Sequence, residues 1–129
     1  MGYAHARITL RNPKIDSLKP VEVDSLADTG SLHLCIPEHL AIQLKLKEIY
    51  KREVTTADGS KHLVSYVGPL QITFGDRGCF GGAIILGDQV LLGAVQMEDM
   101  DLVVSPPERK VIPNPNSPNI PTALAKRLG

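Results

Sequence analysis

The sequence predicts a mainly β protein, built as a small closed or semi-closed β-barrel with one or two short helices. Three observations lead to this fold class. Several short segments alternate apolar and polar residues at period two, as half-buried strands do. Turn-forming pairs such as Asn12-Pro13 and Asp58-Gly59 separate these segments. The stretches that favour helix are few and short.

The N-terminal part is expected to form three strands. Residues 7–10 and 21–27 both alternate, and the turn signals between them predict a hairpin. Residues 31–36 alternate again after an Asp-Thr-Gly turn. In a strand this alternation would place three polar or reactive side chains on one face, namely Ser31, His33 and Cys35.

A short helix and a long hairpin are expected next. Pro37 followed by Glu38 is typical of a helix start, and apolar residues then recur at helical spacing, so a helix is predicted over residues 37–44. Residues 48–74 are rich in Val, Thr, Ile and Tyr and are interrupted only at 57–60, where Asp-Gly predicts the turn of a hairpin.

The next segment predicts two strands and a helix. Residues 79–86 are apolar on both faces, which indicates a buried strand, and residues 90–92 form a short one. A helix is expected over residues 94–100, with Val95 and Met100 directed inward.

The domain is predicted to span residues 1–113, followed by a Pro/Asn-rich extension over residues 114–129. Residues 102–104 are rich in β-branched side chains and end at a Pro-Pro pair. Four prolines from position 113 onward exclude an interior strand, so the extension should run along the surface, with helix favoured only over residues 122–128.

Composition restricts the partners. The 129 residues carry 14 basic and 14 acidic side chains, and only 4% are aromatic, which argues against binding to nucleic acid. No apolar stretch approaches the roughly 20 residues of a membrane span.

With no Trp, the core must come from Leu, Ile and Val. Cys35 and Cys79 lie far apart and outside any CxxC spacing, which predicts free thiols in a reducing cytoplasm.

The most informative motif is an acid, hydroxyl and glycine sequence at the end of an apolar strand. It consists of Asp28, Thr29, Gly30 and Ser31. About sixty residues later a second apolar strand, with Leu91 in its centre, ends in Gly93 and leads into the predicted helix. The long hairpin lies between these two strand ends.

This order of features resembles the retropepsin-like aspartic proteases, in particular their small single-domain bacterial-type members, over roughly residues 6–113. The resemblance implies an acid-protease barrel with a flap hairpin, and a homodimer in which each subunit supplies one catalytic Asp. Asp28 matches that acid. The resemblance also implies that Thr29 hydrogen-bonds across the twofold axis and that Gly30 lets backbone approach the catalytic pair.

The implied activity is hydrolysis of a peptide bond by a water that an Asp dyad activates, with no metal and no cofactor. An extended peptide would lie between the motif and the flap, whose tip falls at Ala57, Asp58, Gly59 and Ser60. Leu26 and Leu91 match pocket-lining positions of the family and suggest apolar side chains next to the cut. By the alternation argument, His33 and Cys35 share the cleft face.

Other interpretations of these residues remain. Asp28 is also a suitable residue to cap its own turn. His33, Cys35 and His39 are three residues of zinc-ligand type within seven positions, although no fourth ligand is evident. An acidic cluster at Glu98, Asp99 and Asp101 is interpreted as a solvated helix face.

A different class of function also fits the barrel. A non-catalytic dimeric module would clamp an extended peptide without cutting it. The single glycine at the expected flap tip, Gly59, favours this alternative because it restricts how the flap opens.

Overall fold

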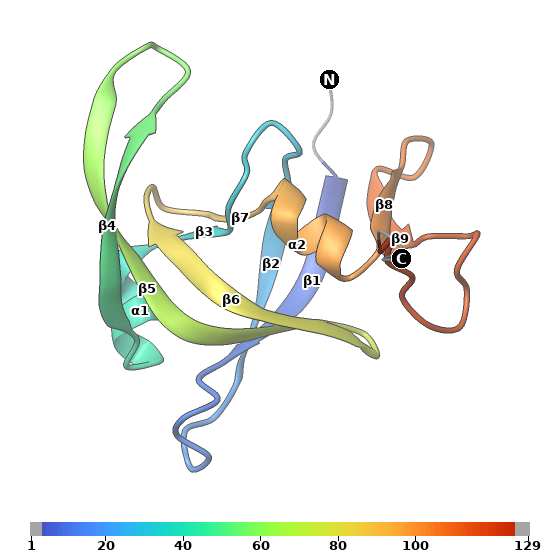
Figure 1. The fold of residues 1–129 in the computed structure, drawn as a ribbon, viewed down its shortest axis with the longest axis horizontal. Coiled ribbons are helices and arrows are strands. Elements are labelled where there is room, and N and C mark those ends of the chain that lie inside the picture. Colours follow the sequence, from blue (N-terminus) through green and yellow to red (C-terminus); the bar gives the residue numbers. More distant parts are fainter. Residues whose placement is uncertain (1–3, 126–129) are drawn as a thin grey trace, which may run out of the picture.

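Six strands close into a barrel in the computed structural model, which describes residues 4–125 (Figure 1). Hydrogen-bonded neighbours run β1–β2–β7–β3–β6–β5 and return to β1. The strands are β1 (Ala4–Arg11), β2 (Val21–Ala27), β3 (Cys35–Ile36), β5 (Lys61–Phe74), β6 (Arg77–Ile85) and β7 (Val90–Leu92). The mainly β barrel predicted from the sequence is therefore confirmed.

Three strands and two short helices complete the fold. Within residues 4–125, β4 (Lys47–Thr55) pairs only with β5, and together they form a long hairpin that projects beyond the barrel (Figure 1). β8 (Leu102–Ser105) and β9 (Lys110–Pro113) form a second hairpin beside β1. The helices are α1 (Glu38–Gln43) and α2 (Ala94–Asp99). Within residues 4–125, neither is long and apolar enough to cross a membrane.

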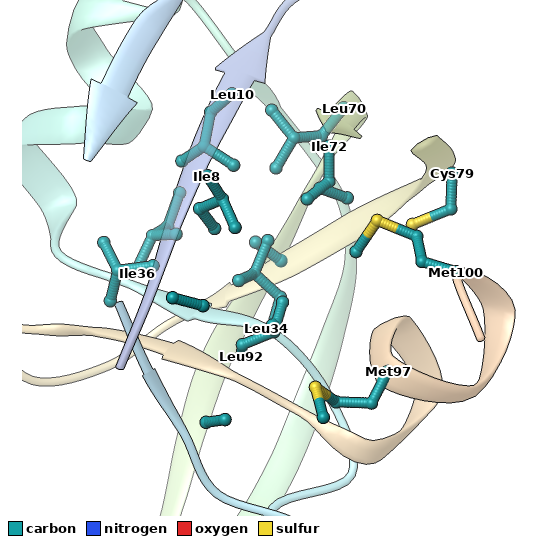
Figure 2. Packing of buried hydrophobic residues seen from close by; sticks show 14 of the residues in the cluster. Ile8, Leu10, Leu34, Ile36, Leu70, Ile72, Cys79, Leu92, Met97 and Met100 are labelled. Carbon is teal, nitrogen blue, oxygen red and sulfur yellow. The ribbon is translucent and has the colours of Figure 1, made fainter. Parts of the chain in front are cut away.

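The barrel interior is filled by aliphatic side chains, as the lack of Trp implied. β1 alternates strictly, so that every second side chain points inward. Its Ile8 and Leu10 meet Leu70 and Ile72 of β5 and Leu34, which precedes β3 (Figure 2). Met97 and Met100 of the α2 region close one side of this cluster. The helix predicted over residues 37–44 is found as α1, with Leu40 and Leu44 buried, whereas Ile36 belongs to β3.

The strand expected over residues 31–36 is wrong for most of its length, because only Cys35 and Ile36 pair as strand. The carbonyls of Ser31 and Leu32 instead accept the backbone N–H groups of Ala94 and Val95, at 2.8 and 3.0 Å. This stretch therefore serves as the N-terminal contact of α2.

Two expected side-chain directions also differ. Phe80 is 67% exposed, because the first half of β6 has one face in solvent and only its second half is enclosed on both faces. Val95 is 40% exposed, since the helix begins at Ala94 and positions 97 and 100 share its inner face. Residues 122–125 are irregular where a helix was expected, and positions 126–128 lie outside the described residues.

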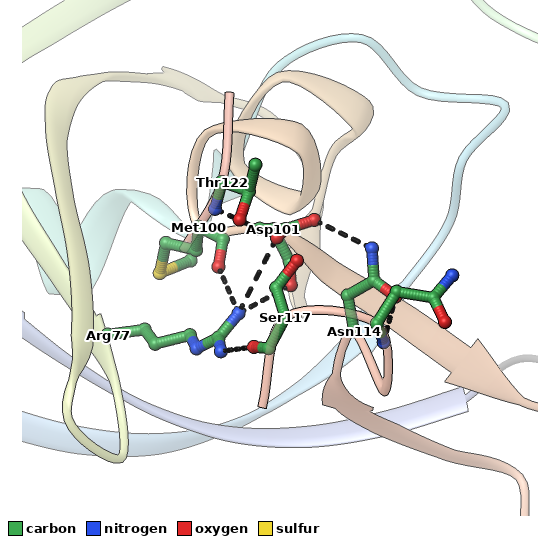
Figure 3. A network of polar contacts seen from close by, with 7 residues as sticks. Arg77, Met100, Asp101, Asn114, Ser117 and Thr122 are labelled. Atoms are coloured by element: carbon green, nitrogen blue, oxygen red, sulfur yellow. Dashed lines mark hydrogen bonds and ion pairs between the residues drawn. The ribbon is translucent and has the colours of Figure 1, made fainter. Parts of the chain in front are cut away.

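A buried arginine ties the C-terminal extension to the barrel (Figure 3). Arg77 is only 2% exposed. Its guanidinium donates to the carbonyls of Met100, at 3.4 Å, Asp101, at 2.8 Å, and Ser117. The Asp101 carboxylate accepts from the Asn114 side chain at 3.0 Å and from the Thr122 N–H at 2.9 Å. The extension is thus held by charge-assisted hydrogen bonds.

We expect Arg77→Met to lower the free energy of unfolding by about 2–3 kcal/mol, because buried carbonyls would lose their donors. Arg7→Met is the matched control, since Arg7 forms only exposed ion pairs with Glu22 and Asp24 and should leave stability nearly unchanged. Urea denaturation of both variants provides the measurement. Equal losses would show that the buried contacts of Arg77 contribute nothing.

Candidate active site

The Asp28 loop and Gly93 lie side by side because the strands that precede them are parallel neighbours. In the register of β2 and β7, Ala27 is opposite Leu92. The backbone N–H of Asp28 donates to the carbonyl of Leu92 at 3.0 Å, which extends this pairing by one residue. The two segments that sequence analysis singled out therefore leave the barrel at the same edge.

The Asp28 carboxylate is oriented by its own loop. The side-chain Oδ1 of Asp28 accepts a hydrogen bond from the N–H of Gly30 at 3.0 Å. The backbone carbonyl of Asp28 accepts one from the N–H of Ser31 at the same distance. A Cβ at position 30 would lie 3.1 Å from Oδ1, so glycine suits this close approach. Within residues 4–125, Oδ2 has no hydrogen-bond donor. Asp28 therefore does cap its own turn, through Oδ1. Its other oxygen, Oδ2, is left available to a reactant, because the side chain is half-exposed.

Gly93 permits a very close contact on the other side of the loop. A Cβ there would lie 2.6 Å from the carbonyl carbon and oxygen of His33 and from the carbonyl oxygen of Leu32. Real Cβ atoms do not approach backbone this closely, so no side chain fits without moving the loop. Glycine at this position lets the loop after Asp28 rest on the start of α2.

A hollow of about 250 Å³ opens beside the Asp28 loop. It brings together Gly30, Ser31, His33 and Cys35, although residues 31–34 are not a strand. The opposite walls come from the hairpin and from the end of β6, and consist of Val54, Thr55, Ile84 and Leu86.

The two leucines predicted to line one substrate pocket lie beside different hollows. Leu26 and Leu91 are opposite each other in the β2–β7 register. Leu91 packs against the small cluster of Cys35, Val64 and Ile84, which borders the hollow. Leu26 lines a different hollow, of about 470 Å³, next to His39.

The tip of the β4–β5 hairpin is a closed, hydrogen-bonded turn. Asp58 Oδ1 accepts from the Thr56 hydroxyl at 2.7 Å, and from the Ser60 hydroxyl and N–H at 2.6 and 3.0 Å. These bonds, those from Ser60 first, hold the pKa of Asp58 well below its usual range. Gly59 supplies the positive φ of +87° that the turn requires, and Ala57 lies in the same turn. The tip does not line the hollow among the described residues. The strand residues Val54 and Thr55 do so instead.

His33 belongs to a cluster that sequence analysis missed. Its ring makes an edge contact with Tyr66, with 5.8 Å between centroids, and the guanidinium of Arg52 lies 4.9 Å above the Tyr66 ring. Burial lowers the pKa of His33, and the Arg52 charge lowers it further. The period-two alternation of the hairpin would have shown that Arg52 and Tyr66 share a face, but not that this face meets His33.

The possible zinc ligands do not converge. His33 lines the hollow beside Asp28, whereas His39 lines the one beside Leu26. In the part of the chain that the structure describes, no three His, Cys, Asp or Glu residues lie close enough together to hold a metal ion. Asp101, expected on a solvated acidic face, is instead bound by Asn114 and Thr122.

Comparison with known proteins gave structural neighbours only. No protein-family model matches the chain, and no curated protein matches its sequence. Simian foamy virus protease is 14% identical, with 70% of this chain and 90% of the viral chain covered at a TM-score of 0.49. A retropepsin-like aspartic protease from Rickettsia conorii is 17% identical, with coverages of 82% and 91% and a TM-score of 0.46. A Legionella pneumophila protein of unknown function is 18% identical, with coverages of 76% and 85% and a TM-score of 0.42. The similarity is one of overall fold.

We expect Gly93→Ala to destabilise the protein by about 1–3 kcal/mol, because the added methyl group overlaps the backbone of the loop after Asp28. Gly81→Ala is the matched control: nothing lies within 4 Å of its Cβ position, and a strand accepts Ala there. Urea denaturation compares the two. A Gly93→Ala protein as stable as the control would refute the close packing of this loop.

The thiol of Cys35 reports on the charge of Asp28. Burial raises the pKa of Cys35, and the negative charge of Asp28 raises it further. Asp28→Asn removes that charge, so the pKa should fall, more thiolate should be present at pH 8, and alkylation should accelerate by roughly twofold. Cys79, with a pKa raised by burial to about 11, serves as the reference in the same sample. Mass spectrometry of iodoacetamide adducts measures both sites, and an unchanged ratio would contradict this coupling.

Proposed function

We propose that this chain is an aspartic endopeptidase that acts as a homodimer, with Asp28 of each subunit contributing to one catalytic pair. One observation carries the proposal. A half-exposed carboxylate, oriented through one oxygen by the Gly30 N–H, stands at the common end of two parallel strands beside a hollow that a long hairpin borders.

The dimer follows from the chemistry of the acid. Peptide hydrolysis needs one group that accepts a proton from water and another that donates one, and a single carboxylate cannot do both at once. Two carboxylates held close together share one proton, which supplies both forms. In a twofold-symmetric contact a residue near the axis meets its own copy, so one exposed Asp28 per chain is sufficient. Thr29, which is exposed next to it, is proposed to bind the partner loop.

The reaction requires only carboxylates and water. The ionised Asp28 takes a proton from water as its oxygen attacks the peptide carbonyl, and the protonated partner donates to the developing oxyanion. Collapse of the tetrahedral diol breaks the C–N bond, and the amine leaves with the proton that Asp28 had accepted. One diol hydroxyl returns its proton to the partner carboxylate as the product acid forms, which restores the singly protonated pair. The proposal therefore invokes no metal and no cofactor.

The substrate is proposed to be an extended peptide in the hollow, flanked by the Asp28 loop and β4. Leu91, at the edge of the apolar cluster, favours an apolar side chain near the cut. Cys35 and Cys79 are both free and buried, which fits the reducing cytoplasm proposed for the protein.

One observation favours the alternative of a non-catalytic peptide-binding module. The hairpin turn is closed by the bonds to Asp58, so the tip itself is rigid. A cleft of this kind suits retention of a peptide as well as its turnover.

Cleavage of a mixed peptide library between about pH 4 and pH 7 tests the proposal. The wild-type protein should cut, Asp28→Asn should cut at least a hundredfold more slowly because the pair loses its base, and activity should fall at the upper end of the range as the shared proton is lost. Asp76→Asn, an exposed acid in the β5–β6 turn, is the control and should retain activity.

A mixing experiment separates one shared site from two independent ones. When Asp28→Asn protein is exchanged into wild type, activity should follow the square of the wild-type fraction if both acids serve one site. A linear dependence would reject the dyad. A folded dimer that binds peptides but cuts none, with or without Asp28, would establish the binding module instead.

A further inference from the structure

The two faces of the β4–β5 hairpin differ in charge. In the β4–β5 pairing, Tyr50 is opposite Tyr66 and Arg52 is opposite Val64. These side chains lie on the same face of the hairpin as Val54, which lines the hollow, and we call this the inner face. The hairpin's strand carboxylates, those of Glu48 and Glu53, lie on the outer face. Glu53 does so by the alternation, and Glu48 because the register shifts by one residue between Glu48 and Tyr50, so that Glu48 is opposite Val67. There Glu48 accepts from the Ser65 hydroxyl and pairs with Lys51 at 3.0 Å.

Arg52 is held in place on the inner face without an anionic partner. Its guanidinium stacks 4.9 Å above the Tyr66 ring, and Tyr66 in turn contacts His33 and lies 6.3 Å from Tyr50. Stacking on an aromatic ring leaves the N–H edge of a guanidinium free for a carboxylate. Among residues 4–125, Arg52 forms no ion pair.

The position of Arg52 places its charge along the path of a bound peptide. Val54 and Arg52 are two residues apart on one face of a strand, roughly 7 Å along its direction. His33 joins the two sides, because it lines the hollow and also contacts Tyr66. A peptide extended along β4 that fills the hollow with one side chain therefore presents a neighbouring one to Arg52.

We propose that the cleft selects peptides with an acidic side chain, Asp or Glu, at the position next to Arg52 and His33. This inference rests on the proposed protease function and names the class of substrate. Asp28, the other charge near the hollow, repels an acid, so the selected side chain is a flanking residue and is not at the cut itself.

The electrostatics around His33 agree with this assignment. The Arg52 charge is close enough to His33 to lower the pKa of its ring. A substrate carboxylate between them would meet a fixed guanidinium and an imidazole N–H, and thus two donors. A Lys side chain at the same position would face a like charge.

The test uses peptides cut by the wild-type protein, prepared in pairs that differ only by Glu or Gln at one flanking position at a time. At one position kcat/KM should favour Glu by roughly fivefold, the range of a partly exposed charge pair. High salt should reduce the ratio. In Arg52→Gln the Glu/Gln ratio of kcat/KM should fall to about one, and Arg52→Lys should retain part of the preference for Glu. In Arg52→Glu a peptide with Lys at this position should be cut faster than the Glu peptide.

Lys51→Gln is the matched control, because it removes the same charge from the adjacent residue on the outer face and should leave the Glu/Gln ratio unchanged. If peptides are cut but no position separates Glu from Gln, acid selection is wrong while the protease function stands. If nothing is cut, the protease function fails, and fluorescence anisotropy of the same pairs decides the inference. A Glu preference lost in Arg52→Gln would support it, and equal binding would overturn it.

Discussion

The parallel pairing of β2 with β7 is the constraint on which the rest of the site depends. Because Ala27 lies opposite Leu92, Asp28 and Gly93 follow at one edge, and the Asp28 N–H continues the ladder to the Leu92 carbonyl. A shift of β7 by one residue against β2 would turn Leu91 to the other face of the sheet and move Gly93 away from the Asp28 loop. The loop after Asp28 can then rest on α2 only because position 93 has no side chain.

Hydrogen bonding limits the motion of the parts around the hollow, and each part is fixed independently. The Asp28 loop is held by bonds within itself and to the first N–H groups of α2. The hairpin tip is held by Asp58. Between them, β5 enters the barrel and pairs with β6 from Tyr66 onward, whereas residues 61–65 of β5 pair with β4. The projecting part of the hairpin also meets the barrel through a small apolar cluster and through the Tyr66–His33 contact. Any movement that admits a peptide would therefore bend the projecting part of the hairpin, before β5 pairs with β6.

The charge distribution gives the proposed site its chemical character. Overall the chain is neutral, but its charges are sorted by face. Ion pairs occupy the outer side of the hairpin and the exposed side of β1 and β2, where they contribute little to stability. The single buried guanidinium among the described residues, that of Arg77, is satisfied by carbonyls. Arg52 differs from both groups because it is stacked and exposed beside a hollow, which is the arrangement expected of a residue that recognises a ligand.

Local patterns in the sequence predict the strands, the turns and the position of the acid, because alternation, Asp-Gly and Asp-Thr-Gly each act over a few neighbouring residues. Thus β1, β2, the long hairpin and the Asp28 turn agree with their predictions. Tertiary structure decided how the remaining segments pair. Residues 31–34 alternate like a strand, yet their carbonyls bond to α2, and Val95 faces solvent although it is apolar. The contact of Arg52 and Tyr66 with His33 joins segments far apart in the chain. No local pattern encodes such a contact, because it depends on how the hairpin leaves the barrel and not on the residues next to it in sequence.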